Sequence, residues 1–146
     1  MTLWVLDTDC ISLFQQGHPN LTQRISAVNP EEIAVTIITV EEQLRGRFHV
    51  IRQTHSSEKL VLAYARLRAT LEYFQTINQL DFDRKAYDCY TELIRQKVRI
   101  GTQDLRIAAI VISRNSILVT RNQSDFSRVP NLRFEDWTLD ESNSGN

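Results

Sequence analysis

Apolar runs that lie next to an acidic residue, or a few positions from one, constrain the fold of this chain more than any other feature. Asp7 and Glu42 each follow such a run, Asp104 opens one, and Asp125 comes after one. The runs occupy residues 3–6, 35–39, 107–112 and 117–120. In a parallel sheet the carboxyl ends of the strands lie along one edge, and ligands bind there. The pattern therefore predicts that four acids from distant parts of the chain meet in one pocket.

Strand and helix patterns alternate along the sequence. Runs of β-branched and apolar residues predict strands at residues 2–6, 33–38, 79–82, 117–120 and 132–134. Between them, hydrophobic residues at helical spacing, breaks at Gly17 and Gly101 and a cap at Thr102 predict helices. The expected helices cover about residues 8–16, 20–28, 39–53, 58–77, 84–98 and 102–112. Alternation of this kind indicates an α/β domain with a parallel sheet and right-handed crossovers.

Length and composition favour one compact domain in the cytoplasm. A chain of 146 residues can bury a substantial core, and we expect a domain at residues 1–138 and a disordered polar tail at 139–146. The 17 basic and 18 acidic residues nearly balance, so net charge does not indicate nucleic acid. We find no signal peptide, no apolar run long enough to span a membrane and no CxxC pair. These absences predict a cytoplasmic protein whose Cys10 and Cys89 stay reduced.

Each of the four acids also has an explanation that involves no ligand. Glu42 fits a capping box with Thr39, and Asp104 fits the first turn of a helix, where a carboxylate favours the helix dipole. Asp125 fits a turn. Asp7 is harder to explain, because an acid directly after a buried strand is costly without a partner. A shared metal site explains all four positions together, since hard cations prefer carboxylate oxygens.

Several segments, in the same order along the chain, resemble the motifs of PIN-domain ribonucleases of the VapC toxin type. The segments are Leu6-Asp7-Thr8-Asp9, residues 39–46, residues 100–109, residues 118–126 and the closing Phe134-Glu135-Asp136-Trp137. Cys10 stands where such sequences often have histidine, and Gln43 replaces the commoner leucine. The resemblance implies a three-layer α/β/α sandwich around a parallel sheet of four to five strands.

The resemblance also implies the chemistry of the pocket, which would bind one or two Mg²⁺ or Mn²⁺ ions. The ligands would be the carboxylates of Asp7, Glu42, Asp104 and Asp125. Asp7 and Asp104 would bind most directly, and Glu42 would orient or deprotonate a metal-activated water that attacks a phosphodiester bond of RNA. Thr120 and Asn122 would orient the ligating carboxylates by donating hydrogen bonds.

Arginines near the predicted pocket are candidate contacts for RNA phosphates, whose negative charge the acids repel. Arg121 lies beside Thr120, and a basic set lies on the helix beside Glu42. That set consists of Arg45, Arg47, His49 and Arg52. Solvent-exposed arginines that bind nothing are common, and this is the alternative explanation for each of these residues.

Two kinds of protein partner follow from the same resemblance. VapC-type proteins pair as homodimers and are held inactive by a small antitoxin that covers the site. An apolar stripe from Leu60 to Phe74 fits one face of a long helix. The stripe suits a dimer contact, although packing against the chain's own sheet would use the same residues.

Two other functions stay open at this point. The segment from Trp4 to Ile11 also resembles the first motif of haloacid-dehalogenase-type phosphatases, in which Asp7 would attack phosphorus and Asp9 would act as acid and base. Ile11 stands where that family has Thr or Val, and its downstream acidic pair is missing. The other possibility is a PIN fold that only binds a partner, against which the presence of all four acids counts.

Overall fold

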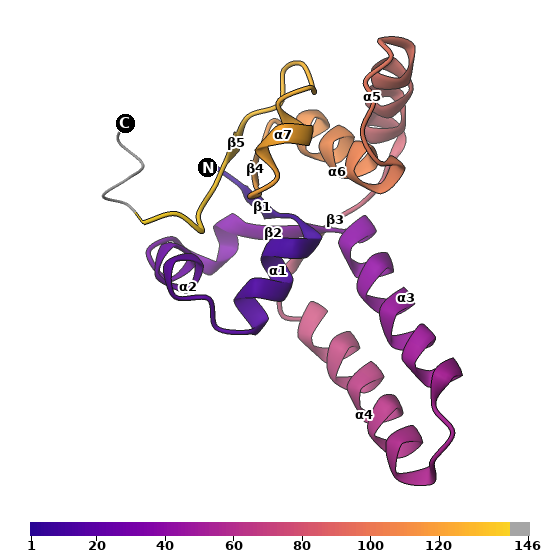
Figure 1. Ribbon diagram of the computed structural model, residues 1–146. Helices are drawn as coiled ribbons and strands as arrows, with labels where there is room; N and C mark the ends of the chain where they lie inside the picture. Colours follow the sequence, from indigo (N-terminus) through magenta and orange to yellow (C-terminus); the bar gives the residue numbers. More distant parts are fainter. Residues whose placement is uncertain (141–146) are drawn as a thin grey trace.

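A computed structural model describes residues 1–140 and confirms the predicted alternation of strands and helices (Figure 1). Five strands form one sheet in the order β3-β2-β1-β4-β5, and every neighbouring pair is parallel. The strands are β1 (Trp4–Leu6), β2 (Ile33–Thr36), β3 (Asn78–Leu80), β4 (Ile117–Val119) and β5 (Phe134–Glu135). The predicted α/β class and the parallel sheet of four to five strands are therefore confirmed.

Helices cover both faces of the sheet (Figure 1). They are α1 (Thr8–Gln15), α2 (Pro19–Ser26), α3 (Ile37–Gln53), α4 (Ser57–Phe74), α5 (Arg84–Arg95), α6 (Thr102–Ser113) and α7 (Gln123–Phe126), with a 3-10 turn at Pro30–Glu32. Side chains alternate between the faces, as the pleat of a strand requires. Val5 and Leu118 pack with α5 and α6, whereas Leu6 and Val119 pack with α1 and α2. The predicted three-layer α/β/α sandwich is confirmed.

The register of the central strands aligns their carboxyl ends along one edge of the sheet. Leu6 of β1 lies opposite Val119 of β4, so Asp7 and Thr120 directly follow a matched pair. β2, on the other side of β1, ends nearby at Thr36. The last residues of all three strands are buried, and the register places Asp7 and Thr120, which follow β1 and β4, side by side at one edge of the sheet.

The strand predicted at residues 33–38 is two residues too long. β2 ends at Thr36, whose hydroxyl accepts a hydrogen bond from the Thr39 amide at 3.3 Å and caps α3. Ile37 and Ile38 therefore lie in the first turn of α3, although β-branched residues favour strands. The buried contacts of Ile38 stabilise the helical conformation against this propensity.

Smaller differences occur elsewhere along the chain. The third strand is Asn78–Leu80 rather than 79–82, the last is Phe134–Glu135 rather than 132–134, and the short helix α7 was not predicted. From residue 141 on, the predicted tail at 139–146 lies outside the described residues. Among the described residues no helix has the length and hydrophobicity that crossing a membrane requires.

Helices α3 and α4 form a long hairpin that projects away from the sheet (Figure 1). The helix predicted around the apolar stripe is confirmed, but most of the stripe does not pack on the sheet. Leu60, Tyr64 and Leu71 are exposed, and only Phe74 at the base of the hairpin joins the core. Val61 and Leu62 beside the stripe are exposed as well.

Candidate active site

A pocket of about 660 Å³ opens at the carboxyl edge of the sheet. Its walls come from the β1–α1 junction, the side of α3, the first turn of α6 and the segment after β4. The lining residues are Asp7, Thr8, Asp9, Ser12, Glu42, Asp104, Arg121 and Asn122. The structure thus brings three of the four predicted acids into one pocket, and among the described lining residues Arg121 is the only cation.

Asp7 is held in place by several contacts and is only 5% exposed. It caps α1, since its Oδ1 accepts a hydrogen bond from the Cys10 amide at 2.8 Å. Its Oδ2 accepts one from the Thr120 hydroxyl at 2.6 Å. Burial raises the pKa of Asp7, and these hydrogen bonds oppose that rise. Asp7 is therefore a fixed carboxylate at the end of β1, with Thr120 at the end of β4 orienting it.

Glu42 is oriented by a residue of α1, across the pocket from its own helix. Its Oε1 accepts a hydrogen bond from the Thr8 hydroxyl at 2.7 Å. The Thr8 and Thr39 hydroxyl oxygens are also within hydrogen-bond distance of each other, at 3.0 Å. The capping-box explanation for Glu42 is wrong, because Thr36 caps α3 and Glu42 lies beyond its first turn. A contact between residues 34 positions apart instead turns the carboxylate toward the pocket.

Asp104 lies in the first turn of α6, where Gly101 rather than Thr102 is the N-cap. Among the described residues nothing donates a hydrogen bond to its carboxylate. Burial raises the pKa of Asp104 to about 6, and the charges of Asp7, Glu42 and Asp125 add to this rise. Asp104 is therefore a half-buried acid that faces like charges and, within residues 1–140, lacks the hydrogen-bond donors that hold the other acids.

Asp125 lies in the first turn of α7 and does not line the pocket. Its Oδ2 accepts a hydrogen bond from the Asn122 side-chain amide at 3.0 Å, and Arg128 lies 3.9 Å from its Oδ1. Asn122 also caps α7 through the Asp125 amide. These local contacts partly explain why an acid stands at this position. The carboxylate of Asp125 still lies near enough to raise the pKa of Asp104.

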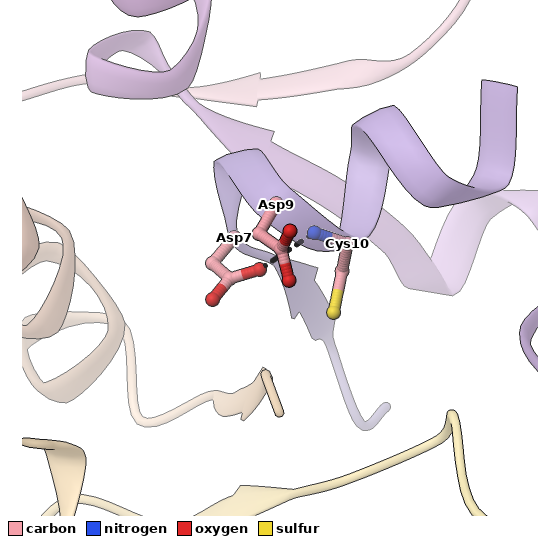
Figure 2. Close-up of side chains that lie close together, drawn as sticks. All are labelled: Asp7, Asp9 and Cys10. Atoms are coloured by element: carbon pink, nitrogen blue, oxygen red, sulfur yellow. Dashed lines mark hydrogen bonds between the residues drawn. The ribbon is translucent and has the colours of Figure 1, made fainter. Parts of the chain in front are cut away.

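Asp9 lies beside Asp7 in the first turn of α1 (Figure 2). Arg121 donates hydrogen bonds to both of its carboxylate oxygens, from Nε at 2.6 Å and from Nη2 at 3.1 Å. A bidentate pair of this kind is strong and directional, and it neutralises Asp9 at the rim of the pocket. Outside the phosphatase interpretation, no role for Asp9 was predicted, because its partner lies 112 residues away.

One cluster of potential metal ligands differs from the predicted set. The ligand atoms of Asp7, Asp9 and Cys10 lie within 4.8 Å of one another (Figure 2). Cys10 is fully buried, and burial raises the pKa of its thiol, which therefore stays protonated and binds metal poorly. Because Asp9 is paired with Arg121, Asp7 is the member of this cluster that remains available to a cation.

The two arginines predicted as RNA contacts have different surroundings. Arg121 lines the pocket while its side chain remains 51% exposed. Arg45 is 68% exposed, does not line the pocket and pairs with Glu41 at 3.0 Å. The structure therefore gives Arg121 access to a ligand in the pocket and directs Arg45 to the outer surface of α3.

The donors around the pocket fit a hard divalent cation. Asp7, Glu42 and Asp104 offer only carboxylate oxygens, the ligands that Mg²⁺ and Mn²⁺ prefer. A cation would replace the repulsion at Asp104 with attraction, and it would supply the partner that this carboxylate lacks. The hydrogen bonds to Asp7 and Glu42 also match the outer contacts that orient metal ligands in proteins.

Comparison with known proteins assigns the chain to a family. The PIN domain family matches residues 4–132. Ribonuclease VapC1 of Haemophilus influenzae is 26% identical over 145 residues, which cover 93% of this chain and 98% of that protein. The tRNA(fMet)-specific endonuclease VapC of Salmonella typhimurium is 27% identical over 142 residues, covering 94% and 99%.

The solved structures agree with this assignment. VapBC-1 from nontypeable Haemophilus influenzae is similar with a TM-score of 0.73 and 26% identity, over 94% of this chain and 100% of that one. PIN-domain nucleases depend on metal, and the acidic cluster at the sheet edge is consistent with that property. Because the family match covers most of its length, this chain belongs to the PIN-domain family.

Proposed function

We propose that this chain is a cytoplasmic endoribonuclease of the VapC type that cleaves RNA with Mg²⁺ or Mn²⁺. The observation that carries the proposal is the state of Asp104. Its carboxylate is half-buried, receives no hydrogen bond among the described residues and faces three other acids. Such an arrangement is costly without a cation and favourable with one. An oxygen-lined cation site open to solvent suits phosphodiester hydrolysis.

The side chains of the proposed site have different roles in metal binding, orientation and proton transfer. Asp7, Glu42 and Asp104 would hold the metal, with Asp125 binding directly or through water. When bound, the metal would lower the pKa of a water molecule and offset the charge of the scissile phosphate. Thr120 keeps Asp7 oriented, and Thr8 does the same for Glu42. Glu42 then accepts a proton from the attacking water.

Arg121 is the residue best placed to contact a substrate phosphate. Its Nε and Nη2 bind Asp9, which leaves Nη1 able to donate to a ligand in the pocket. The pair with Asp9 restricts the guanidinium before RNA binds, so that less conformational entropy is lost on binding. Asn122, which also lines the pocket, fixes Asp125 by a side-chain hydrogen bond.

The protein partners would be a small antitoxin that covers the pocket and a second copy of this chain. Three solved relatives are VapBC complexes, from Rickettsia felis, nontypeable Haemophilus influenzae and Salmonella typhimurium. The α3–α4 hairpin offers exposed apolar side chains at Val61, Leu62 and Tyr64, which is unusual for a surface that stays in water. These features support a toxin–antitoxin role and an apolar contact on the hairpin.

The direct test is cleavage of a defined single-stranded RNA by the purified chain in Mg²⁺, in Mn²⁺ and in EDTA. An Asp7→Asn variant purified in the same way exposes contaminating ribonucleases. Cleavage that requires metal and disappears in the variant is the expected result. Metal-dependent cleavage that persists in Asp7→Asn would mean that the activity does not come from this pocket.

Two further measurements, one with a small phosphate ester and one with Asp9→Asn, test the phosphatase interpretation, which the family match already contradicts. Asp7 is a poor nucleophile here, since both of its oxygens accept hydrogen bonds and it is almost fully buried. Asp9 is bound at both oxygens by Arg121. Hydrolysis of a small phosphate ester by the wild type is therefore expected to be absent, and Asp9→Asn should retain most RNA cleavage.

A further inference from the structure

A second cleft of about 520 Å³ adjoins the acid pocket between α1 and α3. The two cavities share Thr8, Ser12 and Glu42, so a ligand in one can continue directly into the other. The second cleft is lined further by Gln15, Gln16, Gln43, Gly46 and Arg47. Its volume lies within the range of cavities that bind small ligands. Apart from the shared Glu42 its lining contains no acid, which distinguishes it from the metal pocket.

The wall of this cleft is built from side-chain amides. Gln43 of α3 donates to the Ser12 hydroxyl at 3.2 Å and to Gln15 at 3.3 Å, and Gln15 donates back at 3.4 Å. These bonds are longer than typical hydrogen bonds, which are near 2.9–3.0 Å. Each amide also has further donor and acceptor capacity. A ligand that offers better geometry can therefore replace these contacts at low cost.

A cation closes the far end of the cleft. Arg47 is half-buried, and its Nε donates to the Thr70 hydroxyl at 2.9 Å. Thr70 is itself buried and bonded to the Arg66 carbonyl, so the guanidinium is anchored from behind. Arg47 has no ion pair within residues 1–140, and its two Nη groups remain able to donate. A half-buried guanidinium of this kind suits an anionic ligand.

Gly46 keeps the side of the cleft open. A Cβ atom added there would meet no atom of residues 1–140 within 4 Å, so Gly46 borders open space. A larger side chain at this position should therefore fit the fold and yet fill the cleft.

We infer that this cleft is a nucleotide subsite next to the scissile phosphate. The amides of Gln43 and Gln15 recognise the edge of an RNA base, and Arg47 binds a neighbouring phosphate. Glutamine amides suit this task because they pair a donor with an acceptor, as base edges do. Single-stranded RNA presents such edges to proteins. The inference rests on the proposed ribonuclease function and adds to it the residues that choose the cut site.

The first test compares cut-site preference. Wild type, Gln43→Leu and Arg47→Gln are each given a single-stranded RNA pool with randomised positions in Mg²⁺, and the cleaved ends are sequenced. Gln43→Leu should lose a base preference beside the cut, with kcat/KM for the preferred base falling about tenfold. Arg47→Gln should raise KM at every sequence, leave kcat unchanged and reduce the salt dependence of binding. Unchanged preference in Gln43→Leu would overturn the base contact.

The second test measures binding without cleavage. In an Asp7→Asn background, Gly46→Phe should weaken the binding of a fluorescent single-stranded RNA about tenfold, the loss expected for one nucleotide. Arg84→Gln on α5 removes the same charge as Arg47→Gln, from a side chain that is 84% exposed, and should bind as the background does. Thermal unfolding checks that each variant is folded.

The two tests separate failure of the subsite from failure of the nuclease. RNA binding that depends on Gly46 and Arg47 in a protein that cuts nothing would support the subsite and contradict the proposed function. Cleavage by the wild type, with preference and RNA affinity unchanged in every variant, would support the nuclease and overturn the subsite. If Gly46→Phe weakened only self-association of the chain, the cleft would be a protein contact, and the inference would be wrong.

Discussion

The acid pocket and the α3–α4 hairpin depart from the usual distribution of polar and apolar residues in opposite directions. In the pocket Asp7 is 5% exposed, although acids are rarely buried. On the hairpin Val61 is 72% exposed and Tyr64 is 55% exposed, although large apolar groups usually gather in a core. Each region is unfavourable in the isolated chain and becomes favourable when a ligand covers it. The comparison indicates a cation for the pocket and a protein for the hairpin.

One helix connects the two regions. The first turns of α3 are buried at Ile38, Thr39 and Val40, which fixes the direction from which Glu42 enters the pocket. Further along the same helix Phe48 and Val50 are exposed. Substitutions in the first half of α3 should therefore affect RNA cleavage or binding, whereas those at the exposed apolar positions of the hairpin should affect association. The two regions can be tested separately.

The largest expected effect is that of Asp7→Asn on RNA cleavage. The variant removes the buried carboxylate that would pair with the metal ion. Losing one partner of a buried charge pair costs roughly 2–5 kcal/mol, so cleavage should fall about 30- to 5000-fold. Single-turnover cleavage in Mg²⁺ measures the change. Asp88→Asn on α5 is the matched control, since Asp88 is 62% exposed and lies outside the pocket. Cleavage within about threefold of wild type in Asp7→Asn would remove the pocket from the mechanism.

Asp104→Asn should lower cleavage while stabilising the metal-free protein. The native pKa of Asp104 is raised from 3.8 to about 6, so the fold binds a proton more tightly than the unfolded chain does. The stability of the wild type therefore falls as pH rises from about 4 to about 6, and the full cost is present above that range. Above pH 6 the variant should be roughly 1–2 kcal/mol more stable in EDTA, because solvent screens part of the repulsion at a half-buried carboxylate.

Urea unfolding of wild type and Asp104→Asn at pH 4, 5, 6 and 7.5 checks this prediction. The difference should be small at pH 4, reach its maximum above pH 6 and shrink or reverse when Mg²⁺ is added, because the metal binds the charged carboxylate. A variant that is less stable than wild type at pH 7.5 in EDTA would contradict the proposed repulsion.

Thr120→Val should have an intermediate effect, through the orientation of Asp7. Losing a residue that orients a metal ligand typically lowers metal affinity or activity about 10- to 100-fold. Isothermal titration with Mn²⁺ and cleavage rates should both show the loss. Thr120→Ser keeps the hydroxyl that donates to Asp7 and should stay close to wild type. Equal losses in both variants would indicate that the methyl group matters and the hydrogen bond does not.

The smallest effect on cleavage is expected on the hairpin. Val61→Glu changes an exposed position, so the free energy of unfolding should shift by less than about 0.5 kcal/mol and cleavage should stay unchanged. Sedimentation equilibrium should show a smaller dimer fraction, because a charge then lies in an apolar contact. If cleavage fell and association did not change, the apolar surface of the hairpin would belong to the active site.

Local sequence signals predicted most of the elements but not all of their limits. Runs of β-branched residues located β1, β2 and β4, and helical spacing located α4. The same β-branched signal extended the second strand through Ile37 and Ile38, which start α3 instead. Capping by Thr36 and burial of Ile38 against distant elements decide that boundary, and the burial is not visible in a window of neighbouring residues.

The candidate site shows the same division. Its acids could be named from their places beside predicted strands and at a predicted helix start, because a parallel sheet brings carboxyl ends together whatever the details of packing. The partners of these acids could not be named so readily. Thr8 donates a hydrogen bond to Glu42, which lies 34 positions away in the sequence. Arg121 donates to Asp9, which lies 112 positions away. Thr120 was predicted to orient a ligand, but the structure was needed to show that this ligand is Asp7.

The sequence by itself determined the α/β class and the order of the elements, because hydrophobic periodicity is a local property. It also pointed to the carboxyl edge of the sheet, where Asp7, Glu42 and Asp104 line one pocket. Tertiary structure decided which acids receive hydrogen bonds and which one, Asp104, faces like charges with no donor among the described residues. It also decided that the apolar side of α4 stays exposed. These outcomes depend on distances between segments far apart in the chain, which only the packed fold establishes.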